Sequence, residues 1–228
     1  MKGRKSIKSE PASARLASGS GRNLQPIVLL KPEKDGGKSV LAALWKRKTT
    51  RAVRSKRLSP QVLSNLLWAA FGVNRKRGPF GGPGRTAASA SSSQEIDVYV
   101  FLPEGVYLYE ATFHRLAAVR TGDLRGILVG FGNDEYVMKA PVNLLYVSDL
   151  SRYGRAPFME PGLLDREVQK SYSNIAVGLI AGNVYLYAAS QGLAAWLHNC
   201  RREKVADELN LKPEQRVLYV QTVGYPVS

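Results

Sequence analysis

The stretch from Ile96 to Ala111, IDVYVFLPEGVYLYEA, constrains the fold of this 228-residue chain more than any other segment. Its residues alternate with period two on both sides of a Pro-Glu-Gly turn. This pattern is typical of two antiparallel strands joined by a short turn. We therefore expect a β-hairpin here, and the remaining elements have to pack around it.

Helical patterns precede and follow this hairpin. Ser39 is a candidate N-cap for a short helix, and Ser59 with Pro60 begins a second helix that Gly72 ends. Apolar residues at helical spacing predict a long helix over 165–191, in which Gly178 and Gly182 allow close packing. A short amphipathic helix is expected in REKVADELNL (202–211), and Trp45 and Trp68 are expected in the core.

The strand patterns do not alternate regularly with the helices. Buried strands are expected in 140–150, in 192–199 after the long helix, and in RVLYVQTVGYP near the end of the chain. The segment 74–94 is rich in Gly, Pro and Ser and predicts a loop. This order favours an α+β domain with a mixed, mostly antiparallel sheet over a doubly wound sheet.

The beginning of the chain differs in composition from the rest. Residues 1–38 are expected to form a flexible basic tail, in which LQPIVLL (24–30) is a possible packing arm, and residues 39–228 to form one domain. The formal net charge is +15, and residues 1–40 hold only nine of the 33 bases. The positive charge is therefore spread along the chain, which favours binding of anions.

Several classes of site and location lack support in the sequence. One cysteine excludes an internal disulfide and fits a reducing, cytoplasmic compartment, and two distant histidines offer no zinc spacing. No pair of carboxylates suggests a catalytic dyad. No apolar run is long enough to cross a bilayer, so we expect no membrane association.

Two polar segments are candidates for binding. WKRKTTRAVRSKR (45–57) holds seven bases in thirteen residues, and in it Arg47 and Arg51 flank Thr49. Guanidinium groups and a hydroxyl suit a phosphate, although a solvated charged surface is the simpler interpretation. The Ser-rich loop 89–94 offers hydroxyls and the Gln94 amide to a flat ligand, although a flexible linker gives the same pattern.

The order of these motifs resembles one known family. Arg47-Lys48-Thr49-Thr50-Arg51, the loop 88–94, the long helix, Gly192-Leu193 and the terminal Gly-Tyr-Pro strand are similar to the nitroreductase family of flavin-dependent oxidoreductases. Within it, they most resemble the dehydrogenases that form thiazole and oxazole rings in peptides. The resemblance implies a nitroreductase-like fold, an obligate homodimer, and FMN bound between the subunits.

The resemblance also implies roles for particular residues. Hydride would pass through flavin N5 between NAD(P)H, or a small organic or peptide substrate, and an acceptor, with no catalytic protein side chain. The basic motif would hold the phosphate and ribityl chain, the Ser-rich loop the ring or ribityl chain, and the turn after the Gly-Leu pair would present a backbone N–H to N5. The implied residues are Arg47, Lys48, Thr49 and Arg51; Ser89, Ser92 and Gln94; and Asn199 and Cys200.

Some features depart from the family pattern. The chain ends at Ser228 without the usual terminal base, which Arg201 or Arg202 would have to replace, and Glu95 stands where the family has proline. The bases flanking the motif are expected to be solvated: Lys46, Arg54, Lys56 and Arg57. Two alternatives stay open: a flavin-free relative that acts as a partner protein, and a basic nucleic-acid-binding module, which the absence of a recognisable reading motif disfavours.

Overall fold

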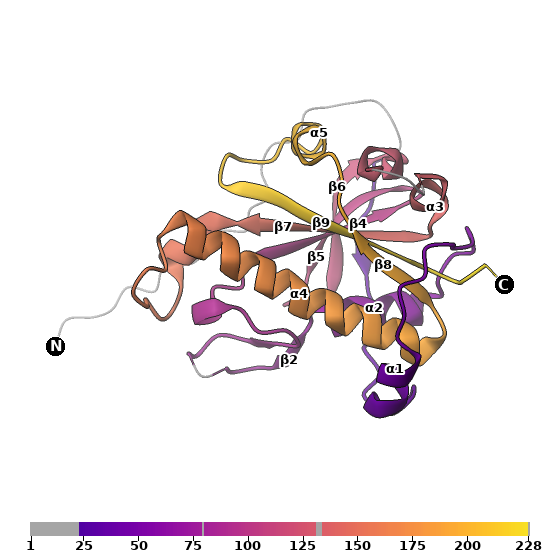
Figure 1. Ribbon diagram of the computed structural model, residues 1–228, viewed down its shortest axis with the longest axis horizontal. Helices are drawn as coiled ribbons and strands as arrows, with labels where there is room; N and C mark the ends of the chain where they lie inside the picture. Colours follow the sequence, from indigo (N-terminus) through magenta and orange to yellow (C-terminus); the bar gives the residue numbers. More distant parts are fainter. Residues whose placement is uncertain (1–22, 79, 131–133, 228) are drawn as a thin grey trace.

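The computed structural model describes residues 23–78, 80–130 and 134–227, and its centre is an antiparallel sheet of seven strands (Figure 1). Their order is β1-β6-β5-β4-β7-β9-β8, and every neighbouring pair is antiparallel. The strands are β1 (Ile27–Val28), β4 (Ile96–Leu102), β5 (Gly105–Glu110), β6 (Arg115–Thr121), β7 (Val142–Asp149), β8 (Ala194–His198) and β9 (Gln215–Gly224). The expected hairpin is β4 and β5, with Leu102 paired to Gly105.

Helices cover both faces of the sheet (Figure 1). On one face lie α1 (Val40–Lys46), α2 (Pro60–Phe71) and the long α4 (Arg166–Gln191); on the other lie α3 (Asp134–Lys139), α5 (Arg202–Glu208) and the 3₁₀ helix η2 (Arg125–Leu128). Two further 3₁₀ helices are η1 (Ala90–Ser92) and η3 (Leu150–Arg155). The arrangement is an α+β fold, as the sequence predicts.

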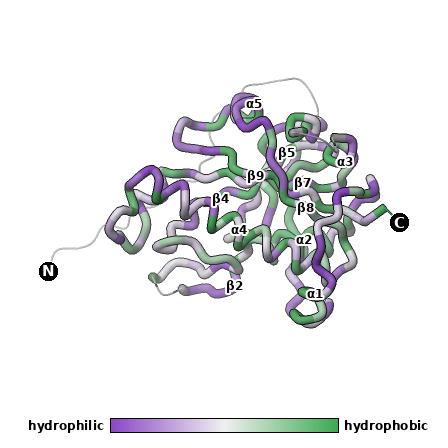
Figure 2. The backbone as a smooth tube through the Cα atoms, in the orientation of Figure 1, coloured by the Kyte–Doolittle hydropathy of each residue, from purple (hydrophilic) through white to green (hydrophobic). Residues whose placement is uncertain are grey.

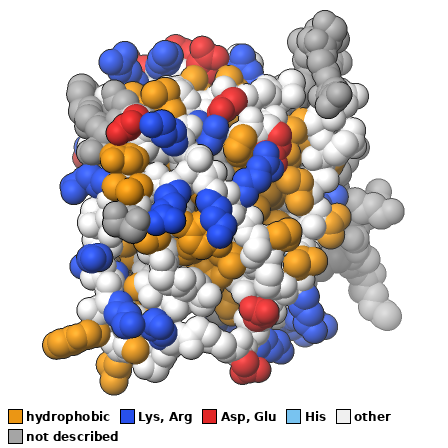
Figure 3. Space-filling model, turned by 90° about the vertical axis from the view of Figure 1, so that its right-hand side faces the viewer, with side chains coloured by type: hydrophobic (Ala, Val, Ile, Leu, Met, Phe, Trp, Pro, Cys, Tyr) orange, Lys and Arg blue, Asp and Glu red, His pale blue; other side chains and the backbone are white. Residues whose placement is uncertain are grey.

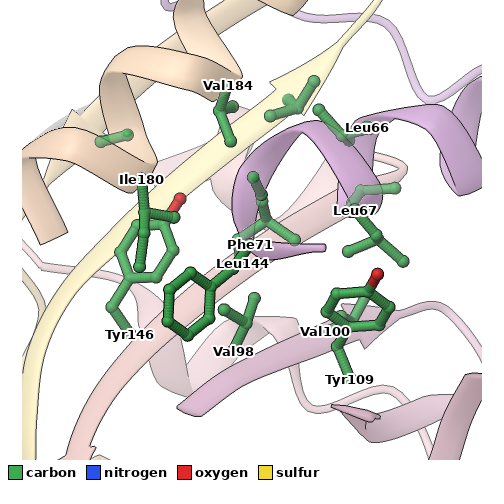
Figure 4. Packing of buried hydrophobic residues seen from close by; sticks show 14 of the residues in the cluster. Leu66, Leu67, Phe71, Val98, Val100, Tyr109, Leu144, Tyr146, Ile180 and Val184 are labelled. Atoms are coloured by element: carbon green, nitrogen blue, oxygen red, sulfur yellow. The ribbon is translucent and has the colours of Figure 1, made fainter. Parts of the chain in front are cut away.

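The alternation within β4 explains why both faces are covered. Val98 and Val100 point to the α2 and α4 face, while Tyr99 and Phe101 point to the opposite face and join the core under α3 and α5. Successive side chains of a strand point to opposite faces, so a strand with apolar residues in both sets needs cover on both sides. Figure 4 shows the first core, where Leu66, Leu67 and Phe71 of α2 meet Ile180 and Val184 of α4, together with Val98, Val100, Tyr109, Leu144 and Tyr146 of the sheet. Hydrophobic residues follow the central strands in Figure 2.

The N-caps of α1 and α2 are those that the sequence predicts. Ser39 Oγ accepts the N–H of Ala42, and Ser59 Oγ accepts the N–H of Val62. At the end of α4, Gly192 adopts a left-handed backbone with φ of 70°, which suits glycine because it has no Cβ.

Some expectations differ from the structure. Trp45 is 92% exposed because it lies on the outer side of α1, so its predicted place in the core was wrong. The predicted loop 74–94 contains the small hairpin β2 (Val73–Arg75) and β3 (Gly84–Arg85) as well as η1. Strand β6 and helix α3 were not predicted.

The arm LQPIVLL is part of the folded sheet. Ile27 pairs with Leu116 and Val28 with Arg115, and Leu29 is buried in the main core. The expected flexible tail over 1–38 therefore differs from the structure in this stretch, while residues 1–22 lie outside the described residues.

Candidate functional site

The second half of the basic motif is held in an extended conformation between β8 and the end of the chain. The N–H of Thr50 donates to Ala195 O of β8 at 3.1 Å. The N–H of Arg54 donates to Tyr225 O at 2.8 Å, and that of Val227 to Ala52 O at 3.1 Å. This pairing fixes the motif beside β8, the strand that leads to the turn at Asn199.

Tyr185 of α4 joins the motif to that strand. Its hydroxyl accepts the N–H of Leu197 at 2.8 Å and lies 3.4 Å from Thr49 Oγ1. The Arg47 guanidinium carbon lies 5.6 Å from the centre of the Tyr185 ring, within the range of a cation–π contact. Tyr185 therefore brings together the basic motif, the long helix and β8, and the sequence patterns did not single it out.

Lysines gather in a cavity next to this contact. Lys38, Lys46 and Lys48 line a cavity of about 540 Å³ between the motif and the last turn of α4. Within the motif, Lys48 lines this cavity, whereas Arg47 and Thr49 contact Tyr185. The Arg51 side chain is exposed and makes no hydrogen bond or ion pair in the described ranges. Lys46 had been expected to be merely solvated, and Lys38 was not identified because it lies before the motif.

On the side of the molecule that carries α1 and the C-terminus, Lys and Arg side chains are more widespread than acidic ones (Figure 3). Of the bases expected to be solvated, Arg57 pairs with Glu104 at 3.0 Å and Lys56 lies over the Tyr225 ring at 5.0 Å. The surface is therefore basic around the candidate site, and part of its charge is engaged within the chain.

The backbone of Gly130 packs directly against the turn Asn199–Cys200. A Cβ at residue 130 would stand 2.5 Å from Asn199 O, so only glycine permits this close approach. The backbone N–H of Cys200 donates to no acceptor in the described part of the chain. Backbone donors near the core are nearly always paired, which makes this N–H a candidate donor to a ligand. Burial raises the pKa of the Cys200 thiol to about 11, so the thiol stays protonated at neutral pH.

His198 also holds this turn. Its Nδ1 lies 2.9 Å from Asn199 O and its Nε2 lies 2.9 Å from Thr222 Oγ1. Thr222 Oγ1 donates to Asn143 Oδ1 at 2.6 Å, so both ring nitrogens face atoms that can accept a proton from them. Burial lowers the pKa of His198, and the Asn199 carbonyl opposes this shift. The proton on His198 is thus coupled to the position of the turn.

The Ser-rich loop has an unusual backbone. Ser91, Ser92 and Gln94 have φ values of 49°, 54° and 48°. Left-handed backbone in three non-glycine residues is costly and persists only where other contacts hold it, which is common in binding loops. Gln94 Oε1 accepts from Arg85 Nε at 2.7 Å, and Gln94 N–H donates to Ser89 Oγ at 2.9 Å. The hydroxyl of Ser92 has no partner in the described chain.

Glu95 lies beneath this loop and does not face a ligand. Its side chain is fully buried, and burial raises its pKa. Ser93 Oγ lies 2.8 Å from Ala90 O and 2.7 Å from Glu95 Oε2, and a hydroxyl has only one hydrogen to donate. A protonated Glu95 satisfies both contacts by donating to Ser93. This acid, which stands where the family has proline, therefore lies inside the protein.

The structure brings together only part of the predicted site. Arg47, Lys48 and Thr49 lie beside β8, which leads to Asn199 and Cys200, whereas no hydrogen bond or shared cavity joins Ser89, Ser92 and Gln94 to them within the described chain. Arg202, one of the two arginines expected to take part in phosphate binding, donates to Leu218 O at 3.0 Å and to Asn199 Oδ1 at 3.1 Å. It does not line the lysine cavity, where Lys38 and Lys46 stand instead.

The described residues contain neither a metal-binding cluster nor a membrane-spanning helix. No group of three or more His, Cys, Asp or Glu side chains is placed to hold a metal ion in the described ranges. None of the helices that the structure describes has the length and apolarity needed to cross a membrane.

Comparison with known proteins identifies the family. The nitroreductase family model matches residues 44–225. A crystal structure from Ralstonia eutropha JMP134 is 34% identical, covers 92% of this chain and 93% of its own, and has a TM-score of 0.77. A Methanocaldococcus jannaschii protein is 28% identical over 157 residues, which are 66% of this chain and 73% of that protein. Both carry the name "putative nitroreductase".

A crystal structure of a protein named "Putative NADH Oxidase", from Clostridium acetobutylicum, is more distant. It is 18% identical to this chain and has a TM-score of 0.53. It covers 83% of this chain and 89% of its own, and shows the shared fold alone. None of these names refers to peptide heterocycles. The family match spans most of the folded chain, and so this chain belongs to the nitroreductase family.

Proposed function

We propose that this protein is an FMN-dependent oxidoreductase of nitroreductase type. One observation carries the proposal: Tyr185 joins the basic motif to the strand that ends in the Asn199–Cys200 turn. The two regions that the family uses for the phosphate and for flavin N5 are thereby fixed relative to one another.

The residues present fit FMN. Arg47, Lys48 and Thr49 would hold the phosphate and ribityl chain, with Lys38 and Lys46 supplying further positive charge in the cavity. The backbone N–H of Cys200, for which the described part of the chain offers no acceptor, would be a donor for N5. When bound there, FMN supplies hydride exchange at N5 between NAD(P)H, or an organic or peptide substrate, and an acceptor. The chain itself binds and orients the cofactor, and Gly130 and His198 hold the turn that carries the donor.

We also propose that the functional unit is a homodimer. Ile175 and Leu179 on the outer side of α4 are 57% and 45% exposed, and a Cβ on Gly178 or Gly182 would meet nothing within 4 Å. The neighbouring α1 exposes four more apolar side chains: Val40, Leu41, Leu44 and Trp45. The close packing that the glycines predict therefore has no counterpart within the described chain, and a second copy would supply it.

A dimer also gives the Ser-rich loop a role. Ser89, Ser92 and Gln94 are separate from the basic motif in one chain, so we propose that the partner's loop completes the flavin site. The rigid backbone of the loop, with three left-handed residues, supports this role.

The visible spectrum of the purified protein tests the proposal. We expect flavin absorbance at about one FMN per subunit, released on denaturation, and lost when Arg47→Ala and Arg51→Ala are combined. As a control, Arg77→Ala with Lys76→Ala removes two positive charges from the exposed β2–β3 turn and should keep the flavin. A colourless dimer that ignores added FMN would contradict the proposal.

That outcome would favour the flavin-free relative as a second candidate. The hydrogen bonds of Gln94 to Arg85 and to Pro83 O support it, because they occupy the amide that a ring would need. We do not propose the nucleic-acid module, since the family match accounts for the basic motif. A relation to the peptide-heterocycle dehydrogenases and a cytoplasmic location stay proposals, the latter supported by the single cysteine.

A further inference from the structure

A second cavity of about 540 Å³ lies between the first half of α4, the beginning of β9 and the start of α5. It shares no lining residue with the lysine cavity. Its charged side chains are Arg166, Lys170, Arg202, Arg216 and a single acid, Glu203. Four bases therefore face one hollow against one carboxylate.

The arginines of this cavity are not neutralised by acids. No ion pair joins Arg166, Arg202 or Arg216 to a carboxylate within the described ranges. Lys170 has only a long pair with Glu167 at 3.5 Å, in which both side chains are exposed. Pairs of this kind contribute little. Among the described residues, Glu203 is the single acid that stands against four bases in this cavity, so most of its positive charge is not compensated there.

Arg202 is held in place by neutral groups. Its Nε donates to Leu218 O at 3.0 Å, its Nη2 to Asn199 Oδ1 at 3.1 Å, and the guanidinium lies 5.3 Å from the centre of the Tyr219 ring. These contacts hold the Arg202 guanidinium in one orientation and leave its positive charge unpaired with a carboxylate. A preorganised guanidinium loses less side-chain entropy when it binds an anion.

Arg166 and Lys170 reach the cavity from the first two turns of α4, a helix of 26 residues. The end of this helix is capped within the chain, because Asp165 Oδ1 accepts the N–H groups of Glu167 and Val168. An anion in the cavity would therefore interact with the basic side chains and not with the helix end.

The chemistry of the lining selects a kind of anion. The guanidinium forks of Arg166 and Arg216, with the donors of Arg202 that Leu218 and Asn199 do not use, match the several oxygens of a phosphate better than they match a single carboxylate. Ser148 and Ser173, whose hydroxyls are 2.8 Å apart, form a buried polar side of the cavity, and the volume lies in the range of small-molecule sites.

We propose that this cavity binds a small molecule that carries a phosphate monoester. Inorganic phosphate is the minimal ligand, and NADP⁺, which carries a phosphate monoester that NAD⁺ lacks, is a candidate for the complete one. The proposal does not depend on flavin, because the cavity is formed by the chain alone and is separate from the basic motif.

Binding of inorganic phosphate, NADP⁺ and NAD⁺ to the full-length chain tests this proposal, by calorimetry at constant ionic strength. Arg166→Gln and Arg216→Gln remove single bases from the cavity, and Arg77→Gln removes the same charge from the exposed β2–β3 turn. We expect each cavity variant to weaken phosphate binding about tenfold, because it removes a charge-assisted donor, while Arg77→Gln has little effect. Thermal unfolding of each variant checks that the fold is kept.

Two different results would support the proposal, and each would identify a different ligand. If NADP⁺ binds more tightly than NAD⁺ and loses this advantage in Arg216→Gln, the cavity holds the phosphate of a nicotinamide nucleotide. If only inorganic phosphate shows the Arg216 dependence, the ligand is another phosphate ester. Equal weakening by Arg77→Gln and the cavity variants, or no binding of any probe at millimolar concentration, would overturn it.

Discussion

The hydroxyl of Tyr185 accepts the backbone N–H of Leu197 at 2.8 Å, and thereby ties the long helix α4 to the strand that leads into the Asn199–Cys200 turn. The same hydroxyl lies within reach of Thr49, so one side chain relates the two ends of the proposed flavin site.

Tyr185→Phe should weaken FMN binding and cost about 1–2 kcal/mol of stability, because the N–H of Leu197 loses its acceptor. Tyr187→Phe is the matched control: its hydroxyl donates to Val62 O on the other side of α4, away from the basic motif. We expect similar losses in urea unfolding but weaker FMN binding, measured by flavin fluorescence, only in Tyr185→Phe. Equal FMN affinities would contradict this role.

Gly130→Ala should displace the Asn199–Cys200 turn. The new Cβ would stand 2.5 Å from Asn199 O, which is backbone and cannot move aside alone. We expect FMN affinity to fall at least tenfold. Gly126→Ala in η2 is the control, because the nearest atom to its Cβ, Met138 Sδ, is 4.0 Å away. Unchanged affinity in Gly130→Ala would show that the turn does not contribute to binding.

Leu179→Glu should convert the proposed dimer to a monomer, because it places a charge in an apolar face expected to be buried between copies. Leu164→Glu makes the same change at another exposed leucine, outside α4. Sedimentation at several concentrations gives the mass of each variant. A wild type that is monomeric at all concentrations would refute the dimer directly.

Mixed dimers test whether each flavin site uses two chains. One protomer would carry Arg47→Ala with Arg51→Ala, and the other Ser89→Ala with Gln94→Ala. If the motif and the loop meet across the interface, a mixed dimer retains one intact site, while each parent dimer has none. We expect co-refolding of two colourless parents to restore about half a flavin per subunit among mixed dimers. No recovery would place both groups in one chain.

The pH dependence of stability should reflect the two histidines. Burial lowers the pKa of His114 and of His198 below the ordinary value of 6.5. As the pH falls below 6.5, the unfolded state takes up protons that the folded state resists, so the free energy of unfolding decreases. Urea unfolding at pH 7.5 and 5.5 should show this loss, and it should be smaller in His198→Gln.

Glu95 affects the pH dependence of stability with the opposite sign. Burial raises its pKa above 4.5, so its contribution to the free energy of unfolding is present below pH 4.5 and is lost as the pH rises through the folded-state pKa. Glu95→Gln should therefore make the acid-side loss of stability steeper. A pH profile unchanged by either substitution would contradict both assignments.

Local signals in the sequence predicted the elements that depend on neighbouring residues. Ser39, Ser59 and Gly192 act within one helical turn, and the alternation around the Pro-Glu-Gly turn specifies the β4–β5 hairpin. The two-residue strand β1 could not be predicted in this way, because Ile27 and Val28 are strand only through pairing with β6, far along the chain.

The candidate site was predicted only where a motif marks it. The role of Tyr185 depends on contacts with residues 136 and 12 positions away, and nothing in its neighbours distinguishes it from Tyr187. The sequence could have drawn attention to Gly130, since a glycine outside helices and strands can mark a place where two backbone segments pack closely. Its partner at Asn199 became identifiable only from the fold.

The position of Trp45 gives the protein an intrinsic optical reporter. Its indole lies in water on α1, whereas that of Trp196 is enclosed under the sheet. The emission of a water-exposed indole shifts to the blue when its surroundings become apolar. Association of a second copy across α1 can therefore be followed through Trp45 without any attached dye.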